Sequence, residues 1–575
     1  MSSESHQTRL NGLVAIEMDK VNCIFAAVMA RFAVSAAYFV YAPHASQAEI
    51  ILFVERGRNS PYLCIRNREN RLHLSKERAL CLRFALSLHQ KEKVKNKYNK
   101  KNRKSMKTRF LSVMMFSAII ATTSCTQDDD ILTENNVNVE AEQTLTRSVA
   151  NCEELAGDIA NVKYQVTSDR KAQVGEVFMN VLKGSDCDPE VEAFVDQLRR
   201  EAEEQQDGGA MTRTTMPEPT FAYRYVDFNY ESIDEQGKPV TLSARVCWGM
   251  NISGQEISPK YMALCPHSTI ASDYETPTKD GSLENALLQG DRLLIMPDYL
   301  GYGATKDRVH PYINHDLCTR NSIDALKAGY KVFADLSKVP MDPEWKLYVI
   351  GCSQGGANSL AIHKWLDTHL DFAQRWRFEY SYCACGPYSP VVTFQEYFKQ
   401  KKLDYPIVLP LTLKAMFAAY PEILGKWKEE DFYSETYLKH KSVVDYMISS
   451  KEYTSGSINK EIFKMFPHKG EAGIKDGAQI WLTDILNPEV MNPESEMSKA
   501  LFLCLDKNDL TKGWNPVHPI HLYHGKSDTI VGFANSEAVM AAFPDMATLD
   551  VSLAGTDGHL ITCAKWMAKV KFGNW

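Results

Sequence analysis

The amino-acid sequence predicts an α/β fold, with a mostly parallel sheet covered by helices on both faces. Short continuous apolar runs alternate with amphipathic stretches in residues 221–390, and the same alternation resumes in residues 506–575. Continuous apolar strands separated by helices are typical of a parallel sheet buried on both sides. Between these halves, in residues 391–505, the strand signal disappears and helix-forming and aromatic residues dominate. We therefore expect one α/β core in two parts, with a large helical cap inserted between them.

The predicted core opens with a hairpin. Polar and apolar residues alternate from Phe221 to Asn229, a turn is expected at Glu235–Pro239, and Val240–Trp248 forms the second strand. Later apolar runs are expected to be strands, and the stretches between them helices. The expected strands are Tyr261–Cys265, Leu293–Met296, Leu347–Ile350, Ile520–Tyr523 and Leu549–Leu553. The expected helices are Leu283–Gln289, Ser322–Leu336, Gln354–Leu366 and Ser536–Phe543.

The segments before the core differ from it in pattern. Residues 151–220 are expected to be an N-terminal helical segment, because Val191, Phe194, Val195 and Leu198 recur at helical spacing. Residues 126–150 are polar and lack hydrophobic periodicity, which is typical of a flexible tether.

Composition excludes several classes of protein. The chain has 575 residues, of which 44% are hydrophobic and 24% charged, so it is neither mostly disordered nor a multi-pass membrane protein. Residues 1–105 hold 19 Lys and Arg against 8 Asp and Glu, whereas the whole chain has a formal net charge of −7. The remainder is therefore strongly acidic. Nucleic acid is not an expected partner, because its binding depends on Lys and Arg replacing counterions.

An export signal lies inside the chain. Met106 to Arg109 is a basic start, an apolar run extends from Phe110 to Ala121, and small residues precede Cys125. Residues 106–125 resemble a bacterial lipoprotein signal, which implies that Cys125 becomes the lipidated N-terminus. The stretch Gln127–Asp130 resembles the acidic tag that sends some lipoproteins to the outer cell surface. The resemblance implies an exported protein with a lipid anchor in the outer membrane, facing the cell surface.

Residues 1–105 are expected to be an over-extended reading frame, absent from the mature protein, because signals of this kind act at an N-terminus and Met106 is a suitable start. The alternative is a genuine N-terminal membrane anchor on Val21–Ala42, which is apolar except for Arg31. Ten of the 14 cysteines lie beyond Cys125, but their spacing predicts no disulfide framework. Cys383-Ala384-Cys385 is interpreted as small residues in a buried strand, with a disulfide or a metal site as the alternative.

The main chemical motif is Gly351-Cys352-Ser353-Gln354-Gly355, which lies between an expected strand and an expected helix. This is the G-x-S-x-G pattern of a nucleophile elbow. A serine on a strained turn leaves little room two residues to either side, so glycine is required there. The following helix N-terminus offers free N–H groups where negative charge develops. Ser353 is therefore the predicted nucleophile.

A serine nucleophile needs a base that a carboxylate orients, in the chain order Ser, Asp or Glu, His. Asp528 follows an apolar strand and is the predicted acid; His559 follows the next strand and is the predicted base. His518, His521 and His524 are interpreted as structural, the last as ordering the turn around Asp528. Three other aspartates compete for the role of the acid. Asp506 and Asp509 precede the strand, and Asp557 lies too near His559 in the chain.

Two backbone N–H groups are needed to bind the oxyanion of the tetrahedral intermediate. Gln354, directly after the nucleophile, is the first predicted donor. The second is expected in Cys265-Pro266-His267-Ser268-Thr269, where we assign the N–H of His267 and keep Ser268 as the alternative.

These motifs resemble the secretory lipase family of α/β-hydrolases, over roughly Phe221 to His559. The matching residues are Met296-Pro-Asp-Tyr-Leu-Gly-Tyr-Gly303, His310-Pro-Tyr312, Gly351-Cys-Ser-Gln-Gly-Gly356 and His524-Gly-Lys-Ser-Asp528. The resemblance implies an α/β-hydrolase fold in which residues 391–505 form a cap over the serine and shape an acyl pocket. It also implies that Asp298 belongs to a structural loop beside the active site.

The expected function is hydrolysis of a small-molecule ester or lipid through an acyl-enzyme, with no metal or cofactor. One alternative is a serine peptidase or acyltransferase, because the same three side chains serve amides and other acceptors. Another is a surface lipoprotein that binds a ligand without catalysis.

Overall fold

The computed structural model describes residues 51–57, 60–67, 70–73, 155–173, 222–279, 281–552 and 557–572. The chain divides into two compact units, Met1–Asp128 and Asp129–Trp575, which are treated separately below. In the first unit, three short strands form an antiparallel sheet that the sequence analysis did not anticipate. These strands are β1 (Ile51–Gly57), β2 (Ser60–Asn67) and β3 (Asn70–His73).

Several features expected near the N-terminus lie outside the described residues. They are the apolar segment Val21–Ala42, the export signal in residues 106–125 with Cys125, the tether in residues 126–150, and the helical pattern from Val191 to Leu198. Within the part of the chain that the structure describes, no helix is both long enough and apolar enough to cross a bilayer.

The second unit is built on a nine-stranded sheet, in the order β14-β13-β10-β9-β7-β8-β6-β5-β4. The six strands from β14 to β8 run parallel, and β6, β5 and β4 continue the sheet in antiparallel pairs. This confirms the predicted α/β class with a mostly parallel sheet. The strands are β4 (Tyr164–Gln173), β5 (Ala222–Ile233), β6 (Pro239–Met250), β7 (Tyr261–Leu264), β8 (Arg292–Pro297), β9 (Lys346–Cys352), β10 (Phe378–Ala384), β13 (Ile520–His524) and β14 (Ala547–Val551).

Strand β4 corrects the sequence prediction. Residues 151–220 were expected to be helical, but Tyr164–Gln173 is an edge strand that pairs antiparallel with β5. Most of its side chains are exposed or half-buried, so it shows no apolar alternation that would mark it as a strand. Pairing with β5, whose residues lie 49 to 66 positions further along the chain, decides the conformation of β4, which local propensity alone does not determine. The hairpin predicted after it is confirmed as β5 and β6.

Helices cover both faces of the sheet, as the residues of β10 demonstrate. Cys383 packs in one cluster with Ala357 and Leu360 of helix α8 (Gln354–Thr368), whereas the ring of Tyr382 contacts Trp566 of helix α20 (His559–Phe572). Because successive strand residues point to opposite faces, α8 and α20 lie on opposite sides of the sheet. The remaining core helices are α7 (His315–Leu336), α9 (Leu370–Arg375) and α19 (Ala534–Ala542), with short 3₁₀ turns η1 (Asp273–Glu275), η2 (Leu283–Leu287) and η3 (Gly303–Thr305).

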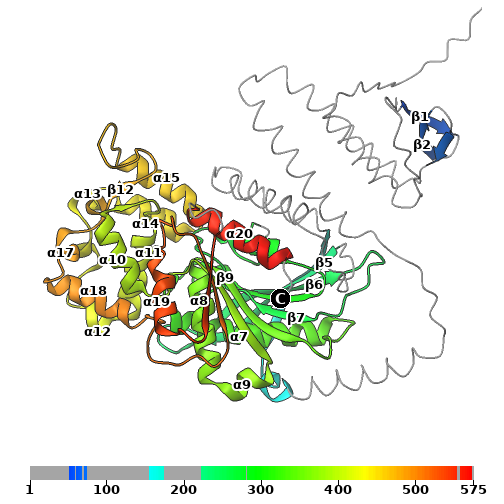
Figure 1. The fold of residues 1–575 in the computed structure, drawn as a ribbon, viewed down its shortest axis with the longest axis horizontal. Helices are drawn as coiled ribbons and strands as arrows, with labels where there is room; N and C mark the ends of the chain where they lie inside the picture. The colour runs from blue at the N-terminus through cyan, green and yellow to red at the C-terminus, as the bar shows by residue number, and fades with distance from the viewer. Residues whose placement is uncertain are drawn as a thin grey trace, which may run out of the picture. The chain divides into compact units, whose positions relative to one another are not determined.

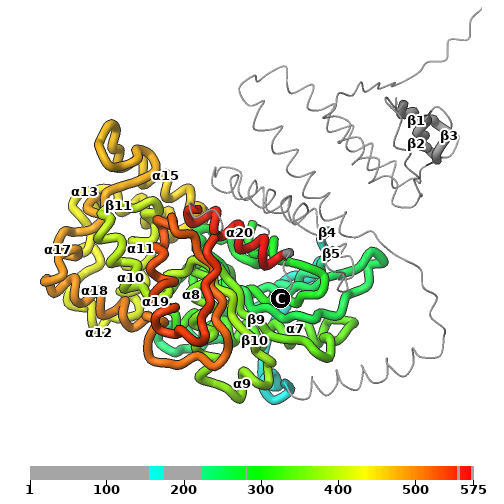
Figure 2. Tube along the Cα trace, in the orientation of Figure 1, coloured from blue at the N-terminus to red at the C-terminus, as the bar shows by residue number. Residues whose placement is uncertain are grey.

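The insertion between β10 and β13 is helical, as predicted, and Figures 1 and 2 show its helices gathered beside the sheet. It has its own apolar core, built around residues such as Leu413, Phe432, Ile462 and Leu486. It also contains a two-residue strand pair, β11 (Lys402–Leu403) with β12 (Ile480–Trp481), and an isolated antiparallel bridge between Tyr433 and Leu486. The helical elements are α10 (Pro390–Gln400), α11 (Val408–Ala419), α12 (Pro421–Leu424), η4 (Glu429–Phe432), α13 (Glu435–Leu438), α14 (Lys441–Ser450), α15 (Ser455–Met465), α16 (Leu482–Ile485), α17 (Pro488–Met491) and α18 (Glu496–Asp506).

Candidate active site

Ser353 occupies the turn between β9 and α8, in the middle of the parallel part of the sheet. Its backbone has φ 56° and ψ −126°, a conformation that residues with a side chain rarely adopt. The N–H of Ser353 donates to the carbonyl of Ala384, at the end of the neighbouring strand β10 (2.9 Å). The strained turn is thus held between two structural elements, and this is the geometry predicted for a nucleophile elbow.

The glycines around Ser353 are required by close backbone contacts. A Cβ at Gly351 would lie 2.4 Å from the carbonyl oxygen of Gly355, and one at Gly355 would lie 2.3 Å from that of Pro266. A Cβ at Gly356 would lie 2.4 Å from the carbonyl oxygen of Ala384. The crowding inferred from the sequence is therefore present on both sides of the serine.

The side chain of His559 lies within hydrogen-bond distance of both Ser353 and Asp528. His559 Nε2 is 2.8 Å from Ser353 Oγ, and His559 Nδ1 is 2.6 Å from Asp528 Oδ2. His559 is the first residue of α20, and Asp528 lies in the loop after β13. Ser353 and His559 are 206 positions apart in the chain, yet together with Asp528 they form one continuous hydrogen-bonded series.

Asp528 is buried and is held from several sides. Its Oδ1 accepts the backbone N–H groups of Ile530 and Val531, each at 2.9 Å, and His524 Nε2 lies 3.2 Å from its Oδ2. Burial would raise the pKa of Asp528, but the charges and hydrogen bonds of His559 and His524 outweigh burial and lower the pKa to about 2. Asp528 is therefore a carboxylate at neutral pH. His524 orders the turn around it, as the sequence predicted.

The competing residues have other partners. His518 Nδ1 lies 2.5 Å from Asp367, and His521 Nδ1 lies 2.8 Å from Thr548 Oγ1. Asp509 accepts a hydrogen bond from Ser389 at 2.8 Å. Asp506 pairs with Lys512, and Asp557 pairs with Lys565. These contacts give each of the five residues a structural role.

Asp298 is also structural. The hydroxyls of Ser243 and Thr278 donate to its Oδ2 at 2.7 and 2.6 Å, and burial raises its pKa to about 6. The Asp298 carboxylate therefore joins the loop after β8 to the segments that contain Ser243 and Thr278.

Gln354 begins α8, so its N–H has no acceptor within the helix. Its side-chain Nε2 lies 2.7 Å from His310 Nε2, and His310 Nδ1 lies 2.9 Å from the carbonyl of Leu300. Burial lowers the pKa of His310 to about 3, so the ring is neutral. Its single N–H donates to Leu300, and its Nε2 accepts the amide N–H of Gln354. This series fixes the residue that follows the nucleophile.

Both candidates for the second oxyanion donor, His267 and Ser268, lie in the loop after β7. The N–H and hydroxyl of Ser268 both donate to Glu284 Oε1, at 2.8 and 2.9 Å, so the N–H of Ser268 is already engaged. His267 is held by the hydroxyl of Tyr299, which donates to its carbonyl at 3.1 Å, and by the Tyr299 ring at 4.0 Å between centroids. Of the two candidates weighed from the sequence, His267 is favoured.

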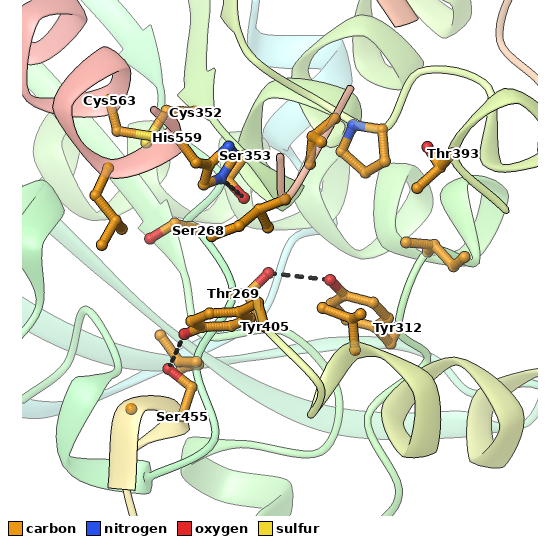
Figure 3. A pocket seen from close by; sticks show the side chains of 18 of the residues that line it. Ser268, Thr269, Tyr312, Cys352, Ser353, Thr393, Tyr405, Ser455, His559 and Cys563 are labelled. Carbon is orange, nitrogen blue, oxygen red and sulfur yellow. Dashed lines mark hydrogen bonds between the residues drawn. The ribbon is translucent and has the colours of Figure 1, made fainter. Parts of the chain in front are cut away.

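A cavity of about 140 Å³ opens beside Ser353 and His559. Core residues such as Ser268 and Tyr312 line it together with Phe394, Tyr405 and other residues of the helical insertion. Figure 3 shows Ser353 and His559 on one side and Tyr312, Tyr405 and Ser455 on the other. The insertion therefore forms part of the wall over the serine, as expected for a cap.

No protein-family model matches this chain, and no curated protein matches it. Among solved structures, a mutant of the rice cell wall degrading esterase LipA from Xanthomonas oryzae is similar, with a TM-score of 0.52 and 17% identity, over 71% of this chain and 97% of that chain. The fold is that of the α/β-hydrolases. Candida antarctica lipase A matches with a TM-score of 0.40 and 12% identity, over 59% of this chain and 73% of that chain.

Several residues around the candidate site have no signal in the sequence that predicts their position. Glu284 belongs to a stretch interpreted only as a helix, which is in fact the 3₁₀ turn η2; burial of its carboxylate against Ser268 is a tertiary effect. The hydrogen-bonded pairs across the cavity from the serine were also missed, because their members come from distant segments. They are Thr269 with Tyr312 (3.1 Å) and Tyr405 with Ser455 (2.7 Å).

Proposed function

We propose that this chain is a serine hydrolase that cleaves ester bonds. The observation that carries the proposal is the continuous hydrogen-bonded series from Ser353 through His559 to Asp528, centred on a strained turn between strand and helix. The similar solved structure with a TM-score of 0.52 is an esterase, which supports the same class of reaction.

The proposed reaction has two acyl-transfer steps. Ser353 Oγ attacks the ester carbonyl while its proton passes to His559 Nε2, and the ionised Asp528 stabilises the resulting imidazolium. The backbone N–H groups of Gln354 and His267 donate to the tetrahedral oxyanion. Collapse of this intermediate expels the alcohol, which takes the proton from His559. Water then attacks the acyl-enzyme with His559 again as base, and the carboxylic acid is released.

The volume of the cavity supports a substrate with a short acyl group. Its volume of about 140 Å³ is close to the roughly 150 Å³ of a cavity that holds one benzene ring. Apolar residues of the cap, such as Phe394 and Val408, line it together with the hydroxyl groups of Tyr312 and Tyr405. We therefore propose esters with acyl groups of about four to eight carbon atoms as the preferred class.

We also propose that the enzyme works at a membrane surface, anchored by lipid on Cys125. This part of the proposal depends on the export signal in residues 106–125.

The decisive experiment compares Ser353→Ala with Ser359→Ala, a buried serine on the helix that follows Ser353. The substrates are p-nitrophenyl butyrate, hexanoate and palmitate, together with an aminoacyl p-nitroanilide. We expect Ser353→Ala to lower kcat by about 10⁴-fold or more, because the nucleophile is lost, and Ser359→Ala to retain most activity. A fluorophosphonate probe should label the wild type and Ser359→Ala but not Ser353→Ala.

Retained turnover or labelling in Ser353→Ala would refute the assignment of the nucleophile. Anilide cleavage that is faster than ester cleavage would favour the peptidase alternative. Absence of both turnover and labelling in the wild type would favour the non-catalytic alternative. Faster hydrolysis of palmitate than of butyrate and hexanoate would contradict the proposed acyl length.

A further inference from the structure

Three buried cysteines lie directly beside the proposed catalytic base, and the mechanism uses none of them. Cys563 is four residues after His559 on α20, so the two side chains share one face of the helix. Cys385 follows the end of β10, and Cys352 precedes the nucleophile at the end of β9. Figure 3 shows Cys352 and Cys563 next to His559, and both cysteines line the cavity.

The distances among these side chains suit a metal ion. Cys385 Sγ lies 3.3 Å from Cys563 Sγ, and a nitrogen of His559 lies within 4.8 Å of both sulfur atoms. A tetrahedral zinc ion with bonds of about 2.3 Å to sulfur and about 2.0 Å to nitrogen requires ligand atoms roughly 3.5 to 3.8 Å apart. Small side-chain rotations would bring the three atoms to that spacing. The thiol of Cys352, which hydrogen-bonds with that of Cys563, is available as a fourth ligand.

We propose that Cys385, Cys563 and His559 form a binding site for a soft divalent cation of the zinc and cadmium type, and that its occupation inhibits the enzyme. Thiolate and imidazole are the ligands these cations prefer, and a pair of ligands four residues apart on a helix is a recurrent arrangement for them. As each metal–sulfur bond forms, the thiol releases its proton to solvent. The cavity provides the route of entry, because Cys563 and His559 both line it.

Inhibition is expected because both ring nitrogens of His559 already make hydrogen bonds. Its Nε2 faces Ser353 Oγ, and its Nδ1 faces Asp528 Oδ2. A cation bound through either nitrogen therefore displaces one of the two hydrogen bonds on which the proposed mechanism depends. This inhibitory consequence rests on the proposed function, whereas binding of the cation does not.

The experiment measures binding and activity separately on the full chain. Cadmium chloride is titrated while the ultraviolet absorption of cadmium–thiolate bonds is recorded, and hydrolysis of p-nitrophenyl butyrate is followed with zinc and then with a chelator. We expect one cadmium per chain and inhibition that the chelator reverses. In Cys563→Ala and Cys385→Ala, the concentration for half-inhibition, relative to each variant's own metal-free rate, should rise at least tenfold.

Cys383→Ala is the matched control, because Cys383 is two residues from Cys385 but packs against α8 in a separate cluster. Cys383→Ala should bind cadmium and be inhibited by zinc like the wild type. Ser353→Ala, which tests the proposed function, should still give the thiolate absorption. Circular dichroism checks that each variant folds, and the two cysteine variants serve as independent tests. Absence of the absorption in the wild type, equal inhibition in all three cysteine variants, or a Cys385–Cys563 disulfide in the purified protein would overturn the proposal.

Discussion

At the residue scale, the candidate site depends on how Asp528 is held. Two imidazoles approach the same oxygen of this carboxylate: His559 at 2.6 Å and His524 at 3.2 Å. His524 is itself fixed by Ser536, whose Oγ lies 2.7 Å from its Nδ1. Because His524 acts on the proposed base only through Asp528, it is a positioning residue rather than a catalytic one.

Replacing His524 with alanine tests this role. We expect kcat for p-nitrophenyl butyrate to fall about tenfold or more with little change in KM, because one hydrogen bond to a charged carboxylate is worth about 1.5 to 3 kcal/mol. His524→Gln retains an N–H donor and should recover part of the loss. His521→Ala, in the same strand but bonded to Thr548, is the control and should keep its kcat. Equal kcat losses in His524→Ala and His521→Ala would contradict a specific positioning role.

At the scale of secondary-structure elements, the turn from β9 into α8 depends on close packing against the loop that follows β7. Gly355→Ala would place a Cβ 2.3 Å from the carbonyl oxygen of Pro266, which precedes the proposed oxyanion donor His267. We expect destabilisation of about 1 to 3 kcal/mol and a fall in kcat of about 100-fold or more, because the loop must shift. Urea denaturation and ester hydrolysis measure the two effects.

Gly157→Ala is the control for this substitution, since nothing lies within 4 Å of its added Cβ. Because Gly157 is exposed in a helical turn, the alanine should leave kcat within error of the wild type and should not lower the free energy of unfolding. Full activity in Gly355→Ala would show that the loop yields without moving the donor, contrary to the packing argument.

A second element-level feature is the attachment of β13 to helix α8 through Asp367. This carboxylate accepts the backbone N–H groups of Val517 and His518 at 2.6 and 3.1 Å, and His363 Nε2 lies 3.0 Å from it. Burial would raise the pKa of Asp367, but the two histidines and the backbone N–H groups lower it below its usual value. The ionised carboxylate therefore stabilises the segment that leads into the strand before Asp528.

The stabilisation from Asp367 should depend on pH. Because folding lowers its pKa, the contribution is fully present above the ordinary value of 3.8 and is lost as the pH falls through the lowered one. We expect Asp367→Asn to lower the free energy of unfolding by about 2 to 4 kcal/mol at pH 7, and the difference from wild type to shrink below about pH 4. Urea denaturation across this range measures it. Exposed Asp371→Asn is the control, and a difference independent of pH would contradict the account.

At the scale of the whole molecule, the α/β core and the helical cap have separate apolar cores, and the cavity lies where they meet. The core supplies Ser353 and His559, whereas the cap supplies walls such as Phe394 and Val408. The proposed catalytic side chains therefore belong to the core, whereas the wall of the cavity is shared between the core and the cap.

We predict that lipid on Cys125 attaches the whole molecule to a membrane in the cell. If Cys125 is lipidated, the wild type should fractionate with membranes and incorporate a labelled fatty acid, whereas Cys125→Ala should do neither. Cys152→Ala, the next cysteine in the chain, is the control and should behave like the wild type. Equal labelling of both variants would contradict lipidation at Cys125.

The sequence alone was sufficient to predict the α/β class, the strained turn at Ser353, and the approach of His559 and Asp528 to it. These predictions depended on local features: apolar runs, glycines that a strained turn requires, and positions just after strands. The conformation of Tyr164–Gln173 was predicted wrongly, because an edge strand that is largely exposed has no apolar period and is defined by its pairing with β5.

Only the tertiary structure decided which side chains surround the reacting atoms. Glu284 engages the N–H of Ser268, His310 orients Gln354, and Cys385 meets Cys563 across 178 positions of the chain. None of these contacts has a local signal, because a hydrogen bond or a close sulfur pair depends on distances in space and not on spacing in the sequence. The sequence determined the chemistry that is present, and folding determined what each reactive group contacts.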